Sequence, residues 1–337
     1  MSSVKIIVRM PNWVGDAVLA LPALGTLRAA YPEAEIWVAG RDWVKDLIAP
    51  GHSVRGFVAL PEARGIKSLL DAGRRVRAQG FDIGLLLTNS FSSALVFRLG
   101  RVRDRWGYAR DGRRFLLTRA VPFKDGGAPL RQRDYYLELL SGLGLKPLSR
   151  EIDLHVSREE KEAADAALDR AGRDRSRPLV ILNPGAAYGP AKRWPAARFA
   201  SLARLLASRA NAEIALVGGP GDRPAAAEIA AAYEGKLLDF TGRTSLRELA
   251  GIITRAGAFV TNDTGPMHMA SALKVPVVAL FGPTDPRQTA PAEPPSTVLK
   301  RDVPCGPCLY RKCPYDHRCM TGIGPEDVFA ACREYLT

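Results

Sequence analysis

Short apolar runs alternate along the chain with longer stretches in which apolar residues recur at helical spacing. Such runs are typical of strands buried in a parallel sheet, and the stretches between them are typical of amphipathic helices. The pattern therefore predicts an α/β protein with two successive series of strands and helices. The predicted strands lie at residues 4–8, 35–39, 54–60 and 82–87 in the first series and at 179–182, 213–217, 258–260 and 275–281 in the second.

A break in this alternation falls at residues 146–158, where Pro147 interrupts the apolar pattern. A linker here predicts a first Rossmann-like domain at 1–155 and a second at 156–324, followed by a helix at 325–337. A chain of 337 residues is long enough for two such domains. The other predicted helices lie at 17–30, 66–78, 134–143, 159–171, 196–208, 224–232, 244–255 and 266–273.

The predicted strand at 258–260 is followed by a polar loop at 262–265 and by a helix that begins near Pro266. Asp and Thr suit an N-cap, and proline suits the first helical turn. The free amides of such a turn, with the positive end of the helix dipole, favour a bound phosphate. Asp263 and His268 would face the same ligand. An ordinary capped loop that binds nothing has the same spacing, so the pattern alone leaves both interpretations open.

Three further loops in the second half, at 185–192, 218–222 and 282–285, follow the carboxyl ends of predicted strands. Parallel topology brings such loops to one edge of the sheet. Gly185 would let the backbone approach a ligand closely, and Lys192 offers a positive charge for a phosphate. Together these loops predict a nucleotide-diphosphate site, although a lysine taken alone is more often an ordinary surface residue.

The loop at 11–16, after the first predicted strand, contains Asp16 at the start of a helix. It has neither the G-x-G-x-x-G fingerprint nor a P-loop, so we do not expect it to bind a dinucleotide. A carboxylate at a helix N-terminus is stabilised as an anion, so Asp16 is either a simple cap or a catalytic base. The polar loop at 88–93 also follows a strand, where open α/β sheets bind ligands.

The chain carries 48 Lys and Arg against 35 Asp and Glu, a net charge of +13. This excess favours an anionic partner, and no nucleic-acid-binding motif accompanies it. The arginine-rich segment at 98–119 is either a solvated face or a dock for an acidic acceptor. No apolar run is long enough to span a bilayer and no signal-peptide pattern is present, so we expect a soluble cytoplasmic protein.

Four cysteines cluster near the end of the chain, and their spacing leaves two interpretations open. They could form a four-thiolate site for zinc or an iron–sulfur cluster, structural rather than catalytic, or they could be reduced thiols in an irregular loop. A cytosolic location argues against disulfides. The four are Cys305, Cys308, Cys313 and Cys319.

Taken as a set, the site motifs make the chain resemble the ADP-heptose:lipopolysaccharide heptosyltransferases, and most closely the type II members. The Gly-Pro-Ala-Lys-Arg-Trp-Pro string at 189–195 is what points to type II. The resemblance runs nearly the whole length. Its other motifs are Trp-Val-Gly-Asp at 13–16, Asn-Pro-Gly at 183–185, Asn-Asp-Thr-Gly at 262–265 with His268, and Phe-Gly-Pro-Thr at 281–284.

The resemblance implies a GT-B fold, with two Rossmann-like domains facing across a cleft, and inverting transfer of a heptose without a catalytic metal. It implies that Asp16 is the general base and that Lys192 steadies the departing ADP. Asp222 is expected at the ribose or base. Donor binding is expected at Gly185, Lys192, Asp222, Asp263, Thr264, Gly265 and His268, and acceptor binding in the first domain at Asn12, Trp13, Gly15, Asn89 and Ser90.

By the same resemblance, the acceptor is an anionic, lipid-linked inner-core saccharide of lipopolysaccharide. The enzyme would then work in the cytoplasm, peripheral on the cytoplasmic face of the inner membrane, and the helix at 325–337 would cross back to the first domain. Two other interpretations stay open: another nucleotide-sugar transferase or epimerase of the same fold, and a non-catalytic nucleotide-binding protein. Epimerases typically carry more histidines in the site, and only His268 of the four histidines falls in these loops.

Overall fold

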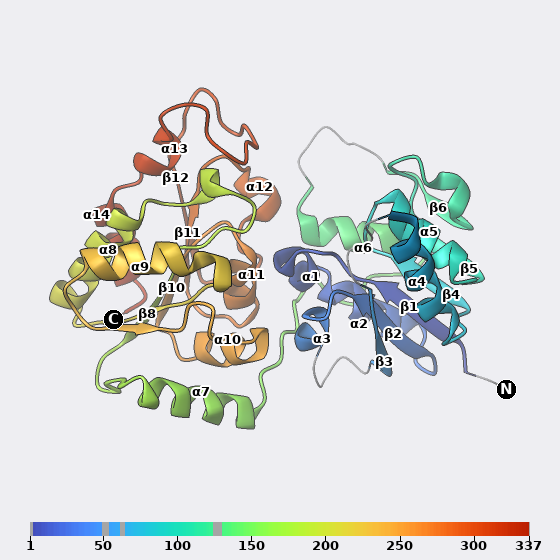
Figure 1. Ribbon diagram of the computed structural model, residues 1–337, viewed down its shortest axis with the longest axis horizontal. Helices are drawn as coiled ribbons and strands as arrows, with labels where there is room; N and C mark the ends of the chain where they lie inside the picture. The colour runs from blue at the N-terminus through green and yellow to red at the C-terminus, as the bar shows by residue number, and fades with distance from the viewer. Residues whose placement is uncertain (1–2, 49–53, 61–64, 124–129, 337) are drawn as a thin grey trace. The chain divides into compact units, whose positions relative to one another are not determined.

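The computed structural model of the protein describes residues 3–48, 54–60, 65–123 and 130–336. Within them the chain divides into two compact units, Met1–His155 and Val156–Thr337. Each unit is built on one six-stranded sheet flanked by helices (Figure 1). The predicted α/β class is therefore confirmed. No helix among these residues is long and apolar enough to cross a bilayer.

The sheet of the first unit has the strand order β3-β2-β1-β4-β5-β6, and every neighbouring pair is parallel. Its central strands are almost entirely buried, which is why apolar runs in the sequence predicted them. The strands are β1 Lys5–Arg9, β2 Glu35–Gly40, β3 Gly56–Ala59, β4 Ile83–Leu86, β5 Asp104–Tyr108 and β6 Arg119–Val121.

The helix predicted at 17–30 is divided at Ala20 into two helices, and Pro22 in the first turn of the second explains the break. The helix over residues 91–99 and the strands inside the arginine-rich segment were not predicted, because polar residues mask their short apolar patterns. The helices are α1 Val14–Leu19, α2 Leu21–Ala30, α3 Val44–Leu47, α4 Gly65–Arg77, α5 Phe91–Leu99 and α6 Gln132–Gly142, with a 3₁₀ turn, η1, at Arg114–Leu116.

The sheet of the second unit has the order β12-β11-β10-β7-β8-β9 and is also parallel throughout. The short β9 and the half-exposed β12 lie at its two edges and were not predicted. The strands are β7 Leu179–Asn183, β8 Glu213–Leu216, β9 Leu237–Asp239, β10 Ala258–Asn262, β11 Val277–Phe281 and β12 Ser296–Lys300.

Helices connect these strands, as predicted from the helical spacing. The helices are α7 Arg158–Arg170, α8 Ala196–Arg209, α9 Arg223–Ala232, α10 Leu246–Ile253, α11 Gly265–Ala272, α12 Pro286–Thr289, α13 Arg318–Thr321 and α14 Pro325–Arg333, with 3₁₀ turns η2 at Pro190–Lys192 and η3 at Pro220–Asp222.

In both sheets the chain starts in the middle, builds one side outward, and then returns to build the other. This order creates a switch point between β1 and β4 in the first unit and between β7 and β10 in the second. Open α/β sheets bind ligands outside the carboxyl ends of the strands at such a point. The loops that follow these four strands are among those singled out from the sequence.

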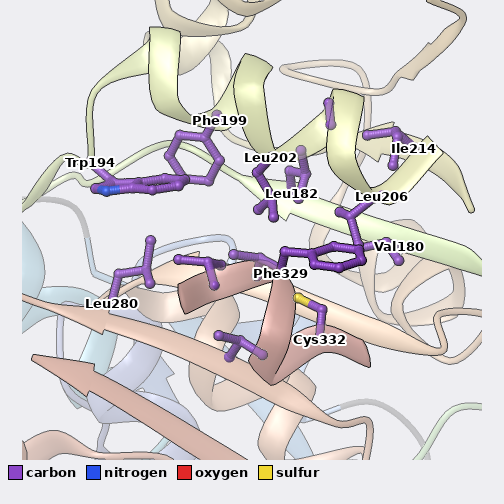
Figure 2. Packing of buried hydrophobic residues seen from close by; sticks show 14 of the residues in the cluster. Val180, Leu182, Trp194, Phe199, Leu202, Leu206, Ile214, Leu280, Phe329 and Cys332 are labelled. Carbon is purple, nitrogen blue, oxygen red and sulfur yellow. The ribbon is translucent and has the colours of Figure 1, made fainter. Parts of the chain in front are cut away.

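Helix α14 packs in the core of the second unit, beside α8. Val328, Phe329 and Cys332 on its buried face join the cluster that includes Leu202 and Leu206 of α8 (Figure 2). The contact of this helix with the first domain, expected from the sequence, stays a prediction. Its apolar stripe is already covered within the second unit.

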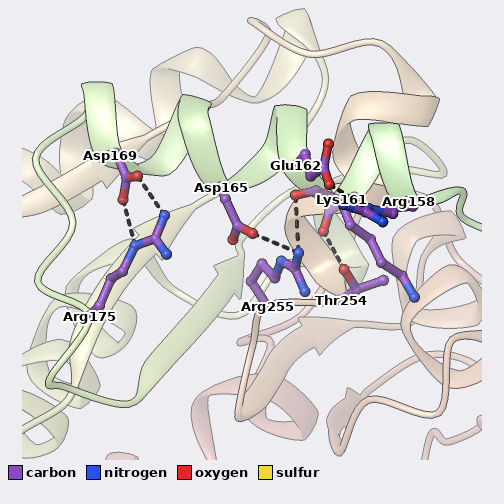
Figure 3. Close-up of polar contacts among 9 residues, drawn as sticks. Arg158, Lys161, Glu162, Asp165, Asp169, Arg175, Thr254 and Arg255 are labelled. Atoms are coloured by element: carbon purple, nitrogen blue, oxygen red, sulfur yellow. Dashed lines mark hydrogen bonds and ion pairs between the residues drawn. The ribbon is translucent and has the colours of Figure 1, made fainter.

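Helix α7 opens the second unit and is held by its cap and by ion pairs. Ser157 accepts a hydrogen bond from the amide of Glu160 and forms a capping box with it. Arg255 forms an ion pair with Asp165 of α7 at 2.7 Å, and further, exposed ion pairs lie along the same helix (Figure 3). Glu160 also pairs with Arg247 of α10. These contacts fix the position at which the chain enters the second sheet.

Candidate functional site

Asn262, the last residue of β10, fastens the neighbouring β7 loop to the switch point of the second sheet. Its side-chain amide donates to the carbonyls of Pro184 and Gly185 at 2.9 and 3.1 Å, and its oxygen accepts from the amide of Trp194 at 3.0 Å. Asn262 is fully buried, so these bonds are shielded from water. The loop that carries Lys192 is thereby held against β10.

Lys192 and Asp263 form an ion pair at this switch point, with 2.5 Å between Nζ and Oδ2. Both side chains are largely buried. The hydroxyl of Thr284, from the loop after β11, donates to the same carboxylate at 2.7 Å. Loops after β7, β10 and β11 therefore converge on one carboxylate. The ring of Tyr188 lies 4.8 Å from the Lys192 ammonium and adds a cation–π contact.

Helix α11 begins directly beside this ion pair. Thr264 is its N-cap residue but makes no side-chain capping bond, and Pro266 stands in the first turn, as predicted. The amide at Gly265 therefore belongs to a helix start that its own N-cap side chain leaves uncapped. Such a start attracts an anion, because its amides and the helix dipole point toward it.

His268, one turn into α11, is buried beside the same pair. Burial lowers the pKa of His268 to about 4, an effect that Lys192 reinforces and Asp263 opposes. The imidazole is therefore neutral near pH 7. One of its ring nitrogens donates a hydrogen bond and the other accepts one. Its Nδ1 has no hydrogen-bond partner among the described residues. An unpaired, buried nitrogen at this place is available to a polar ligand.

Gly185 and Asp222 meet where the loops after β7 and β8 come together. A Cβ on Gly185 would overlap the Asp222 carboxylate, which also accepts from the amide of Gly219 at 3.0 Å. Arg193 lies 3.6 Å from the same carboxylate. Glycine at 185 was predicted to admit a ligand, and in the structure it admits the side chain of Asp222.

In the first unit, the predicted acceptor loop follows β1. Trp13 is the N-cap residue of α1 and is about half exposed, Gly15 is buried, and Asp16 lies in the first helical turn. The Asn12 side-chain oxygen accepts from Arg9 at 2.7 Å. Burial lowers the pKa of Arg9 to about 10, helped by Arg41, so Arg9 keeps its charge at neutral pH.

Asp16 is half-buried and lies near the phenol of Tyr136 on α6. Burial raises the pKa of Tyr136 well above its ordinary value, and the Asp16 carboxylate raises it further. Tyr136 accepts a bond from Gln132 at 3.0 Å. The structure thus sets Asp16 beside a neutral phenol at the carboxyl edge of the first sheet.

The second predicted acceptor loop, after β4, is organised by Arg113. This fully buried side chain donates to the carbonyls of Thr88 and Tyr108 and to the side-chain oxygen of Asn89. Asn89 in turn donates to the hydroxyl of Tyr135 at 2.6 Å. The amide group of Asn89 is therefore engaged at both ends.

Ser90 caps α5 by accepting a bond from the amide of Ser93. That role is structural, although the residue was predicted as a ligand contact. Arg9, at the end of β1, and Arg113, in the loop after β5, support these loops and were not singled out, because neither belongs to a motif. Thr284 was quoted only as part of a string, and its bond to Asp263 depends on strand order rather than on local pattern.

The four clustered cysteines surround a small cavity of about 20 Å³, which His317 also lines. All are free thiols, and burial together with its cysteine neighbours raises the pKa of Cys319. Among the described residues, however, no group of three or more His, Cys, Asp or Glu side chains is arranged to hold a metal ion. The geometry therefore does not support the four-thiolate interpretation.

The chain is similar over most of its length to known proteins of one family. A family model described as glycosyltransferase family 9 (heptosyltransferase) matches residues 69–318. The lipooligosaccharide heptosyltransferase 2 of Haemophilus influenzae is 31% identical over 310 residues, 88% of each protein. The lipopolysaccharide heptosyltransferase 2 of Salmonella typhimurium is 32% identical over 312 residues, again 88% of each.

The solved structure of E. coli ADP-heptose LPS heptosyltransferase II matches with a TM-score of 0.84 at 29% identity, over 99% of this chain and 98% of that one. This likeness confirms the predicted α/β fold of GT-B type and the enzyme class, a glycosyltransferase similar to heptosyltransferase II. Since the family model and these relatives each cover most of the sequence, the chain belongs to glycosyltransferase family 9, the heptosyltransferase family.

Proposed function

We propose that the protein transfers a heptose from ADP-heptose to a hydroxyl of the inner-core heptose of lipopolysaccharide, with inversion at the sugar carbon. The names of its relatives and of the matching E. coli structure support this donor and acceptor. The observation that carries the proposal is the Lys192–Asp263 pair at the uncapped start of α11. It is the kind of site that holds a sugar diphosphate.

On this proposal the second unit binds the donor. The diphosphate lies against the amides of Thr264 and Gly265, and the Lys192 ammonium turns from Asp263 toward a phosphate oxygen. The neutral His268 then bonds to the donor through its unpaired Nδ1, which requires no charge on the ring. Asp263 orients the sugar hydroxyls, and Asp222 is assigned to the ribose or base.

The first unit binds the acceptor, through the loops that hold Asn12, Trp13, Gly15, Asn89 and Ser90. Two buried cations beneath these loops, Arg9 and Arg113, donate only to neutral oxygens among the described residues. Neither charge is cancelled by a hydrogen-bonded carboxylate among these residues, although the Asp111 carboxylate acts on Arg113. The charge of the two arginines favours an acceptor that carries anionic groups.

The reaction is a single displacement. The Asp16 carboxylate removes the proton of the acceptor hydroxyl as its oxygen attacks the anomeric carbon from the face opposite the diphosphate. The bond between that carbon and the diphosphate oxygen breaks, and ADP leaves with the electron pair. Lys192 and the α11 amides steady the negative charge on the leaving group. No cofactor takes part, so a chelator should leave the rate unchanged.

The test is ADP release from ADP-heptose in the presence of a heptose-bearing core acceptor. Wild type should turn over, and Asp16→Asn should keep its affinity for ADP while losing at least about a hundredfold in kcat. Asp42→Asn, an exposed carboxylate in the same unit, serves as the matched control. Full activity of Asp16→Asn would refute the base assignment.

Two other results would overturn the function itself. Tight ADP binding without turnover of any acceptor would indicate a non-catalytic nucleotide-binding protein. Greater thermal stabilisation by UDP- or GDP-sugars than by ADP-heptose would indicate a different sugar transferase. Analysis of the product anomer by NMR tests inversion separately, since retention would require a different mechanism.

The proposed acceptor also sets the location. A lipid-linked core saccharide is accessible to an enzyme that works in the cytoplasm and associates peripherally with the inner face of the inner membrane. The net charge of +13 supports such an association, because that face is anionic. Fractionation of cells into soluble and membrane fractions, with and without a salt wash, tests it.

A further inference from the structure

Two aromatic side chains lie exposed at the carboxyl edge of the first sheet. Phe91 is the first residue of α5, directly after β4 and its loop, and Phe115 lies in η1, in the loop after β5. Their rings are 5.9 Å apart, and the side chains are 42% and 74% exposed. Large apolar side chains that contact each other outside the core mark an interaction surface.

Ile66, which is 77% exposed, extends this surface. Helices α4 and α5 pack side by side (Figure 1). Near their carboxyl ends Gly73 lies against Leu99 and Gly100 against Val76, so the two helices run parallel. The same offset brings Ile66, at the start of α4, level with Phe91 at the start of α5. We call Ile66, Phe91 and Phe115 the edge patch.

Basic side chains accompany the edge patch. Lys67 and Arg114 are exposed and adjoin Ile66 and Phe115 in the sequence. In the loop after β5 that carries Phe115, Arg110 is exposed as well, beside one exposed carboxylate, Asp111. Aromatic and aliphatic side chains set among basic ones fit the interface of a membrane with anionic lipids, where the apolar groups enter the headgroup region and the cations meet the phosphates.

We propose that the edge patch docks the enzyme on a bilayer that contains anionic phospholipid. This inference rests on the proposed function, because the loop with Asn89 and Ser90 immediately precedes Phe91. An acceptor held by that loop would keep its lipid in the membrane against which the patch lies. The basic side chains beside the patch, Lys67 and Arg114, select an anionic bilayer. The three apolar side chains of the patch give the binding a component that salt does not screen.

Co-sedimentation with vesicles tests the docking. Wild type should bind vesicles of phosphatidylcholine mixed with phosphatidylglycerol. Phe91→Ser/Phe115→Ser should bind them at least about tenfold more weakly. Lys67→Gln/Arg114→Gln should lose a similar factor on the mixed vesicles and nothing on pure phosphatidylcholine. The control is Val4→Ser/Leu148→Ser, which removes exposed apolar side chains elsewhere in the unit and should bind like wild type. Equal binding by the phenylalanine variant and the control would overturn the proposal.

Turnover separates this inference from the proposed function. With acceptor embedded in vesicles, the phenylalanine variant should lose most of its rate, whereas with a delipidated, water-soluble acceptor it should match wild type. If wild type turns over neither acceptor yet binds vesicles through the patch, the function fails and the docking stands. If sedimentation velocity shows a wild-type dimer that the phenylalanine variant converts to monomer, the patch is a self-association surface and the docking is wrong.

Discussion

At the scale of single residues, the Lys192–Asp263 pair is the feature from which the site's chemistry follows. The Lys192 side chain is 12% exposed and that of Asp263 is 5% exposed, so each charge depends on the other. Breaking a buried pair from one side leaves an uncompensated charge, whereas neutralising both sides does not. This asymmetry separates the pair's contribution to stability from its contribution to ligand binding.

Lys192→Met should lower the free energy of unfolding by about 3 kcal/mol, because it leaves the Asp263 carboxylate buried without a cation. Lys192→Met/Asp263→Asn should recover most of that loss and still bind ADP weakly, since the cation for the phosphate is missing. Urea unfolding and ADP titration measure the two effects. Arg158→Met, which breaks the exposed pair with Glu162, should cost under about 0.5 kcal/mol. If the single and double Lys192 variants are equally stable, the pair is not the buried unit described.

His268 gives the site a pH dependence of known sign. Its folded-state pKa of about 4 lies below the ordinary value of 6.5. Between those pH values His268 is protonated in the unfolded chain but not in the folded protein. The contribution of His268 to the free energy of unfolding is therefore fully present above about pH 6.5 and is lost as the pH falls toward about 4. From pH 7 to pH 5, His268→Asn should lose about 2 kcal/mol less than wild type. Parallel losses in both proteins would contradict the neutral, buried imidazole.

At the scale of elements, α14 completes the second unit. The strands of that unit are covered by α8 together with α14, and Trp194, Phe199 and Phe329 fill the space between them. Because Phe329 is 5% exposed, its removal would leave a cavity that the surrounding helices cannot fill without shifting.

Phe329→Ala should therefore destabilise the protein by about 3 kcal/mol in urea unfolding. Glu326→Ala lies on the same helix and breaks only an exposed ion pair with Arg209, so it should cost under about 1 kcal/mol. A loss in Phe329→Ala no greater than in Glu326→Ala would show that α14 is peripheral to the fold.

At the scale of the whole molecule, the net charge of +13 acts on any anionic acceptor as a long-range attraction. Such attraction is screened within a Debye length, so it weakens with added salt. The buried charges of Arg9 and Arg113 are screened less, because water and ions do not reach them. The overall positive charge should thus govern how fast the acceptor meets the enzyme. The two buried arginines should govern how the bound acceptor is positioned.

The KM for a phosphorylated, water-soluble core acceptor should rise several-fold, on the order of fivefold, between low and physiological salt. A dephosphorylated acceptor should show a much smaller change at the same donor concentration. Steady-state kinetics across a salt series measure both. A KM that salt leaves unchanged for both acceptors would show that the charge excess does not act on the acceptor.

The central strands and the loops after them were predictable from the sequence. A buried parallel strand is a run of apolar residues, and the loop after it is rich in polar residues and glycine. The edge strands β9 and β12 were not, since short or half-exposed strands lack that run. In the site, the nearness of Lys192 to Asp263 followed from parallel topology. The engagement of Asn89 by Arg113 and Tyr135 did not, because neither partner belongs to a loop after a predicted strand or to a motif.

By itself the sequence determined the two series of strands, the polar loops at their carboxyl ends, and the proline and glycine that open α11, because each depends on neighbours within a few positions. Only the tertiary structure decided which of those groups are already engaged by other residues of the protein. It gave the space above Gly185 to Asp222, kept His268 neutral, and packed α14 against α8. Burial and long-range partners set these outcomes, and neither is a local property of the chain.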